Sequence, residues 1–371
     1  MRPAASCTGG YRGVTIHNPK TVGAWGGATH ESAGMTLSID TPPAPFIAVP
    51  PPLPLFRSSE IPHAERGVAS GDLVRVTRGV LAPAALWWAL PPWQRYEARV
   101  HAVAMTHPGV VFSHESAAAI RGLPVFGEPR EVHVLDTPGA TARSSGGIRV
   151  HVTTGDRLVD DRGGFLVTSL TDTVIDLARG RHGAVGLAVA DAALRIDPHL
   201  TVEKLVAENE VRANSRGRRV ARWTLHRATP LAETVLESVS RAAIEWLGFP
   251  DPELQVQFRT DGVVDRVDMW WEDVRAIGEA DGEVKYDGSL QPAAFAIAKE
   301  KERDRRLRRH ASGLAHWGWR DVAQIGPLRE SLRQAGLRPT GPESSRELYR
   351  LGAVLQPPRA SRLDTAPARR D

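Results

Sequence analysis

Alternating apolar and charged positions define several short strands in the first two thirds of the chain. Residues 71–83 (GDLVRVTRGVLAP) alternate apolar and basic side chains on either side of Gly79. This pattern predicts a hairpin whose Arg75 and Arg78 face solvent. Three further β-branched runs, separated by Gly, Pro or Asp, predict strands within residues 130–168. Helical spacing of apolar residues predicts helices over 93–105, 114–121, 171–179 and 184–194, so we expect an α+β region over residues 60–210.

A second set of patterns begins near residue 230. Apolar residues recur at helical spacing over 231–247, and three strand-like runs follow at 254–258, 263–271 and 274–280. The connections between these runs are short, which predicts two successive hairpins. A charged helix over 293–311, a strand over 314–319 and a helix over 321–334 complete the order α-β-β-β-α-β-α. We therefore expect an α/β domain over residues 230–337.

Three segments lack a pattern that would build a core. Residues 41–56 contain seven prolines, which favours polyproline II and excludes a helix, so residues 1–59 are predicted to be disordered or a mis-assigned start. Residues 212–227 carry six arginines and no acid, and we interpret 211–229 as a basic linker or solvated helix between two domains. Residues 338–371 are predicted to form a polar, disordered tail.

Composition and charge narrow the function classes only partly. The chain has 371 residues, of which 24% are charged and 42% apolar, which excludes a wholly disordered protein. An apolar run of membrane-spanning length and a secretory signal are both missing, and the single cysteine, Cys7, excludes a disulfide framework. We therefore expect a cytoplasmic protein that does not engage membranes. A net charge of +4 is too small to establish a nucleic-acid partner, so the location of the charge matters.

Carboxylates are concentrated around two of the predicted strands. Glu279 and Asp281 stand two residues apart and share one face of a strand, and the hairpin places Asp268 beside them. Three converging carboxylates repel one another unless a divalent cation is bound, and oxygen ligands suit Mg²⁺ or Mn²⁺. Lys285 could orient an attacking water, and Glu237 on the preceding helix could supply another carboxylate. Together these residues predict a site for metal-assisted phosphodiester cleavage.

This arrangement resembles the PD-(D/E)XK nuclease superfamily, in particular its very-short-patch-repair-like branch. The resemblance covers residues 230–334 and rests on LESVSR with Glu237, RVDMWW with Asp268, and EADGEVKY from Glu279 onward. The EKERDRRLRR run and LAHWGW also match. It implies a restriction-endonuclease-like fold and Mg²⁺-dependent or Mn²⁺-dependent DNA cleavage. One departure is clear, because Asp281 stands where the superfamily has lysine, so activity requires Lys285 to take over that role.

Simpler interpretations exist for each of these residues taken alone. Asp268 and Asp281 could cap turns, and Glu237 with Arg241 could be an ordinary helical ion pair. Residues 299–309 could be a solvated helix face. Ser113 is better explained as a helix cap than His114 is as a catalytic base. His310 and His316 are predicted to lie apart from the carboxylates.

The N-terminal region resembles the abortive-infection antitoxin (AbiEi-like) transcriptional regulators. The resemblance covers residues 57–205 and rests on GDLVRVTRGVLAP, SHESAAAIRGLPVFG and VTSLTDTVIDLAR. It implies a winged helix-turn-helix, here with incomplete first helices, and a cognate toxin as a possible partner. We expect arginines of the hairpin, the linker and the charged helix to contact DNA phosphates. These residues are Arg75, Arg78, Arg218, Arg219, Arg222, Arg305 and Arg308.

Two functions therefore remain open. The first is a metal-dependent endonuclease or nickase with a DNA-binding regulatory front end, belonging to a defence or toxin–antitoxin-type system. The second is a non-catalytic DNA-binding regulator or antitoxin whose nuclease-like fold has decayed. Retention of Asp268, Glu279 and Lys285 favours the first function, whereas Asp281 at the lysine position favours the second.

Overall fold

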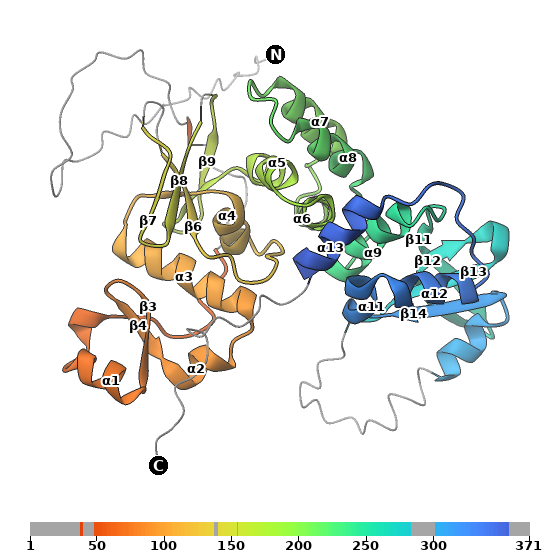
Figure 1. The fold of residues 1–371 in the computed structure, drawn as a ribbon, viewed down its shortest axis with the longest axis horizontal. Helices are drawn as coiled ribbons and strands as arrows, with labels where there is room; N and C mark the ends of the chain where they lie inside the picture. The colour runs from red at the N-terminus through yellow and green to blue at the C-terminus, as the bar shows by residue number, and fades with distance from the viewer. Residues whose placement is uncertain (1–37, 40–47, 137–139, 154, 283–300, 356–371) are drawn as a thin grey trace, which may run out of the picture.

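The computed structural model describes residues 38–39, 48–136, 140–153, 155–282 and 301–355. Helices combine with three sheets of three, four and seven strands, which confirms the expected mixed α and β class. Figure 1 shows the first two sheets of the chain on one side, the last sheet on the other, and helices α5 to α8 between them. Among the described residues, no helix is both long and apolar enough to cross a membrane.

The smallest sheet contains the predicted basic hairpin. Its strand order is β2-β4-β3, and the hairpin turns at Gly79, whose φ of +83° suits a residue without a Cβ. Helix α1 precedes the hairpin. The bounds are β2 (Phe56–Arg57), α1 (Ala64–Ser70), β3 (Leu73–Thr77) and β4 (Val80–Pro83).

The prediction that the first 59 residues lie outside the fold is wrong for residues 38–39, which pair with a later strand, and for residues 48–59. Leu53 is buried in a cluster with Val76, Val80 and Trp87, and β2 pairs with β4. The prolines around Leu53 exclude a helix, but they permit an extended segment that packs against the hairpin.

The seven-stranded sheet follows, in the order β1-β9-β10-β5-β6-β8-β7. Helices α3 and α4 pack on one of its faces around Tyr96, Phe112 and Ile120. Gly122 ends α4 at a φ of +71°, a left-handed conformation that glycine adopts readily. The bounds are β1 (Ser38–Ile39), α2 (Ala84–Ala89), α3 (Pro92–Thr106), β5 (Val111–Phe112), α4 (His114–Arg121), β6 (Val132–Asp136), β7 (Arg143–Ser145), β8 (Ile148–Val152), β9 (Leu158–Asp161) and β10 (Leu166–Thr168).

A helical layer joins this sheet to the rest of the chain. It comprises α5 (Leu170–Gly180), α6 (Gly183–Ile196), α7 (Val202–Val211), α8 (Arg218–Arg227) and α9 (Val235–Trp246). Ala221, Thr224 and Leu225 of α8 are fully buried, so the interpretation of residues 211–229 as a linker is wrong. The arginines occupy the outer face of α8, while apolar residues at helical spacing form an inner stripe that packs against α6.

The last sheet has the predicted strands and turns. Its order is β11-β12-β13-β14, with two antiparallel pairs followed by one parallel pair. The bounds are β11 (Glu253–Thr260), β12 (Val263–Trp271), β13 (Ala276–Ala280) and β14 (Gly313–Trp317). Residues 301–307 are helical, as predicted for this part of the charged helix, but the helix ends four residues earlier than the predicted end at residue 311.

Two features after β14 differ from prediction. The helix expected over 321–334 is broken at Ile325 into α11 (Trp319–Gln324) and α12 (Gly326–Gln334), because Pro327 favours a helix start and disfavours a helix interior. The predicted tail also contains α13 (Ser345–Leu355), whose Leu348 and Leu351 enter the main core. Only residues 356–371 of that tail lie outside the described residues.

One buried ion pair connects three helices of the central layer. Asp191 of α6 has no exposed surface, and its carboxylate lies 3.2 Å from Nη1 of Arg241 on α9. Arg241 also donates a hydrogen bond to the carbonyl of Arg227 at the end of α8. Burial raises the pKa of Asp191 to about 6. The two halves of the chain therefore meet at a desolvated charge pair.

We predict that Asp191→Ala lowers the free energy of unfolding by about 3–5 kcal/mol, because it leaves Arg241 largely buried without its partner charge. The exposed pair Glu233–Arg266 provides a control, and Glu233→Ala should change stability by about 1 kcal/mol or less. Urea unfolding followed by circular dichroism measures both. Equal midpoints for Asp191→Ala and wild type would contradict this view of the central layer.

Candidate functional site

The predicted juxtaposition of Asp268 and Glu279 is present in the structure. Strands β12 and β13 pair Met269 with Gly278, and the same antiparallel register continued by one residue places Asp268 opposite Glu279. Asp268 Oδ2 accepts a hydrogen bond of 2.9 Å from the backbone N–H of Ala280. Both carboxylates therefore lie on one face at the end of β13, and Glu279 is only 4% exposed.

Burial makes these two carboxylates costly to ionise. It raises the pKa of Glu279 to about 7, although the nearby Arg303 guanidinium acts in the opposite direction. The pKa of Asp268 is raised as well, first by burial and then by the charge of Asp281. A bound cation would relieve the repulsion that these neighbouring charges create.

Glu237 lies close to this pair but performs another task. Its Oε1 accepts a hydrogen bond from the backbone N–H of Thr234, and its Oε2 accepts one from that of Glu233. Gln255 Nε2 also donates to Oε2 at 3.1 Å. Burial raises the pKa of Glu237, and the charge of Asp268 adds to this shift. These donors occupy both of its oxygens. Glu237 therefore completes the capping box of α9 with the N-cap residue Thr234, and it is the weakest candidate for a direct metal ligand.

Asp281 follows β13 and is held by a histidine. Its Oδ2 lies 2.7 Å from Nδ1 of His316, and its side chain is 52% exposed. Parallel pairing of β13 with β14 sets His316 beside Glu279. The prediction that His316 lies apart from the carboxylates is therefore wrong, because it considered the hairpin but not the parallel strand β14. The hydrogen bond to Asp281 raises the pKa of His316.

Arg303 of the charged helix contributes a cation to the site, although the sequence alone did not predict this role. Arg303 Nη2 lies 2.8 Å from Glu279 Oε1 and also donates to the carbonyl of Arg266. The signal available in the sequence was helical spacing, since Arg303, Arg306 and the fully buried Leu307 share one face. Lys285, the predicted catalytic cation, lies outside the described residues.

The oxygen donors left at the site suit a hard divalent cation. Counting only the contacts made by described residues, Glu279 retains Oε2, Asp268 retains Oδ1 as the oxygen less used in hydrogen bonding, and the exposed Asp281 retains Oδ1. Within the part of the chain that the structure describes, these three carboxylates do not form a group whose ligand atoms all lie within 4.8 Å of one another. The group that does so is His114, His133 and His151, which the sequence analysis did not bring together. Mg²⁺ or Mn²⁺ at the carboxylates would therefore need side-chain adjustment or water-mediated contacts.

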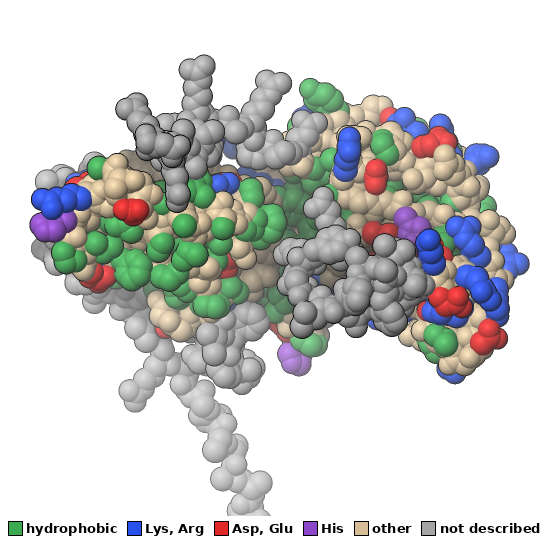
Figure 2. Space-filling view, turned by 90° about the horizontal axis from the view of Figure 1, so that it is seen from below, with side chains coloured by type: hydrophobic (Ala, Val, Ile, Leu, Met, Phe, Trp, Pro, Cys, Tyr) green, Lys and Arg blue, Asp and Glu red, His purple; other side chains and the backbone are tan. Residues whose placement is uncertain are grey.

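The arginines predicted to contact nucleic acid fall into three places. Arg75 and Arg78 lie exposed on the N-terminal hairpin, where Arg75 pairs with Glu65 at 3.1 Å. On α8, Arg222 is engaged by Glu210, Arg218 donates to the carbonyl of Arg212, and Arg219 is exposed. Arg305 is exposed on the helix that carries Arg303, and Arg308 is exposed in the turn that directly follows this helix. Figure 2 shows basic side chains gathered over the C-terminal half, on the right of that view.

Comparison with known proteins neither supports nor contradicts these assignments. No protein-family model, no curated protein and no solved structure matches the chain.

We predict that Asp281→Asn lowers the pKa of His316, because it removes the hydrogen bond and charge that raise that pKa. NMR titration of the imidazole in metal-free protein measures the change. Asp273→Asn, an exposed substitution of the same charge on the turn after β12, is the control and should leave the His316 pKa in place. An unchanged His316 pKa in Asp281→Asn would contradict the observed pairing.

Proposed function

We propose that this chain is a DNA-binding protein whose last sheet carries a metal-dependent phosphodiester-cleaving centre. The observation that carries the proposal is the Asp268–Glu279 pair at the end of β13, in which Glu279 is buried and Asp268 half-buried, flanked by Asp281. Paired carboxylates at such a strand end are a means of holding a divalent cation next to a phosphate. The resemblance of residues 230–334 to the PD-(D/E)XK nucleases supports the same activity.

Each residue has a distinct task in this proposal. Asp268 and Glu279 offer the oxygens that hold Mg²⁺ or Mn²⁺, and Asp281 adds a third carboxylate from the same strand end. The cation, when bound, supplies Lewis-acid stabilisation of the charge that develops on the phosphate. Arg303 holds Glu279 in position, and His316 orients Asp281 through their 2.7 Å contact.

Two cations could substitute for the lysine that Asp281 replaces. Arg303 lies at hydrogen-bond distance from Glu279, and His316 gains a proton more readily because Asp281 raises its pKa. Lys285 remains a third candidate from the sequence alone. A cation near the scissile phosphate would stabilise the transition state electrostatically.

A second function, a non-catalytic DNA-binding regulator, is favoured by one specific observation. The ion pair between Arg303 and Glu279 and the contact between His316 and Asp281 already neutralise part of the carboxylate charge within the protein. In that case the last sheet would be a binding surface, and a cognate toxin would be the partner implied by the resemblance of the N-terminal region.

We predict that the purified chain nicks supercoiled plasmid with Mg²⁺ or Mn²⁺ and not with EDTA. Asp268→Asn and Glu279→Gln should each reduce the rate by about 10² or more, because each removes a charged oxygen ligand. Agarose-gel analysis of relaxed circles measures the rate. Glu272→Gln, on the exposed turn after β12, changes the same charge away from the site and should cut at the wild-type rate.

Cleavage by both site variants at the rate of Glu272→Gln would show that the reaction occurs elsewhere. A wild-type protein that binds DNA but leaves the plasmid intact with either metal would favour the regulator.

We also predict that DNA affinity falls with salt, with a slope of log K against log salt of about 0.9 per neutralised phosphate. The double variant Arg305→Ala, Arg308→Ala should reduce this slope, since both arginines are exposed beside the site. The matched control is Arg143→Ala, Arg149→Ala, which removes two exposed arginines that pair with Asp136 and Glu131. Fluorescence anisotropy measures the slope for each variant. If the Arg305→Ala, Arg308→Ala variant has the same slope as the control, this segment is excluded as a phosphate-contacting surface.

A further inference from the structure

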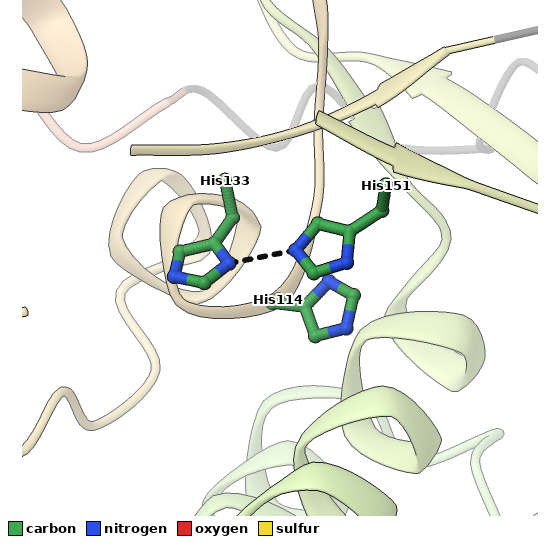
Figure 3. A group of neighbouring side chains, drawn as sticks. All are labelled: His114, His133 and His151. Atoms are coloured by element: carbon green, nitrogen blue, oxygen red, sulfur yellow. Dashed lines mark hydrogen bonds between the residues drawn. The ribbon is translucent and has the colours of Figure 1, made fainter. Parts of the chain in front are cut away.

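Three histidines meet in the N-terminal half, away from the carboxylates described above. They are His114 at the start of α4, His133 on β6 and His151 on β8, and one ligand nitrogen of each lies within 4.8 Å of the other two. His133 Nδ1 and His151 Nε2 are 2.8 Å apart, as the dashed line in Figure 3 marks. The rings of His114 and His151 stack with their centroids 3.9 Å apart. We call these residues the histidine cluster.

The fold places the three side chains together by separate means. Strands β6 and β8 are parallel and pair Leu135 with His151, so His133 and His151 are diagonal neighbours on one face of the sheet. His114 is the first residue of α4, and its φ of 49° is uncommon for a residue with a Cβ. This backbone conformation aims the imidazole at the two strands, as Figure 3 shows.

A carboxylate supports the cluster from behind. Glu115 Oε2 lies 3.6 Å from Nε2 of His133, on the side of that ring opposite the contact with His151. Within the described structure this oxygen is buried and has no hydrogen-bond partner, while Oε1 is engaged by Arg181. A carboxylate behind a coordinating imidazole is a common way of orienting a metal ligand.

The imidazoles also have the protonation state that a ligand needs. Burial is the main cause that lowers the pKa of each histidine to about 4, so all three are neutral near pH 7. The charges that face the cluster are of both signs: Glu115, Glu131 and Asp176 are acidic, and Arg149 and Arg181 are basic. The site is therefore not a simple acidic patch that would attract any cation.

We propose that the histidine cluster binds one divalent transition-metal ion, with Zn²⁺ as the best match. Three imidazole nitrogens are a donor set for Zn²⁺ and its neighbours rather than for Mg²⁺, which takes oxygen ligands. Three protein ligands leave one coordination position for water or another small ligand. A bound ion would tie the start of α4 to β6 and β8, and hence stabilise the seven-stranded sheet.

The test uses the full chain carrying Asp268→Asn, called the parent, so that the carboxylates of the last sheet contribute little to metal binding. Isothermal titration calorimetry measures Zn²⁺ binding to the parent and to variants made in it. We expect one equivalent to bind and to raise the thermal unfolding temperature. Co²⁺ should give the visible absorption of a site rich in nitrogen ligands. His133→Ala and His151→Gln should each weaken binding about a hundredfold or more, whereas Glu115→Gln should weaken it about tenfold.

His199→Ala is the matched control, since His199 is exposed and lies outside the cluster. It should bind Zn²⁺ as the parent does. His133 is buried, so each variant is first checked by circular dichroism; if His133→Ala does not fold, the half-buried His151→Gln decides. No saturable Zn²⁺ binding by the parent, or equal binding by the parent and His151→Gln, would overturn the proposal and leave the cluster as hydrogen-bonded imidazoles without a metal. Because plasmid nicking is not a readout here, the outcome is independent of the proposed nuclease activity.

Discussion

The placement of two opposed carboxylates, one buried and one half-buried, is the constraint on which the candidate site depends. Asp268 and Glu279 face each other across an antiparallel pair of strands, and Glu279 has almost no exposed surface. Ionising both is costly, and the protein offsets part of the cost with Arg303 and the backbone N–H of Ala280. Within the described residues these contacts leave carboxylate oxygens without a partner, and the divalent cation that we propose would be coordinated by them.

A continuous core holds that site on rigid elements. The main apolar cluster runs from α4 through α5, α6 and α8 to α9, and then into β12, β13 and α13. The N-terminal half and the last sheet therefore share buried surface. A basic hairpin at one end and exposed arginines beside the carboxylates at the other place two cationic surfaces on one framework. In the function that we propose, these two surfaces would contact DNA phosphates in two separate regions.

Local patterns in the sequence predicted much of this fold, and the failures have physical reasons. Alternation and short turns identified the hairpins, and antiparallel register then brought Asp268 to Glu279. Arg303 was not predicted at the site, and His316 was wrongly predicted to lie apart from it. These residues reach Glu279 from a helix and a parallel strand, at sequence separations that the register of a hairpin does not cover. In α8, the many arginines led to a linker prediction although the helix has a narrow apolar stripe. The histidine cluster depends on three separate elements, and no local sequence pattern predicts that these elements come together.

The central claim is that the carboxylates at the end of β13 hold a divalent cation, and a crystal of the chain grown with Mn²⁺ tests it most directly. Anomalous scattering from manganese locates the ion without reference to activity. The account predicts a peak between the carboxylates of Asp268 and Glu279, lost in crystals of Asp268→Asn. A map at saturating Mn²⁺ with no peak there, and with Arg303 still paired to Glu279, would contradict it.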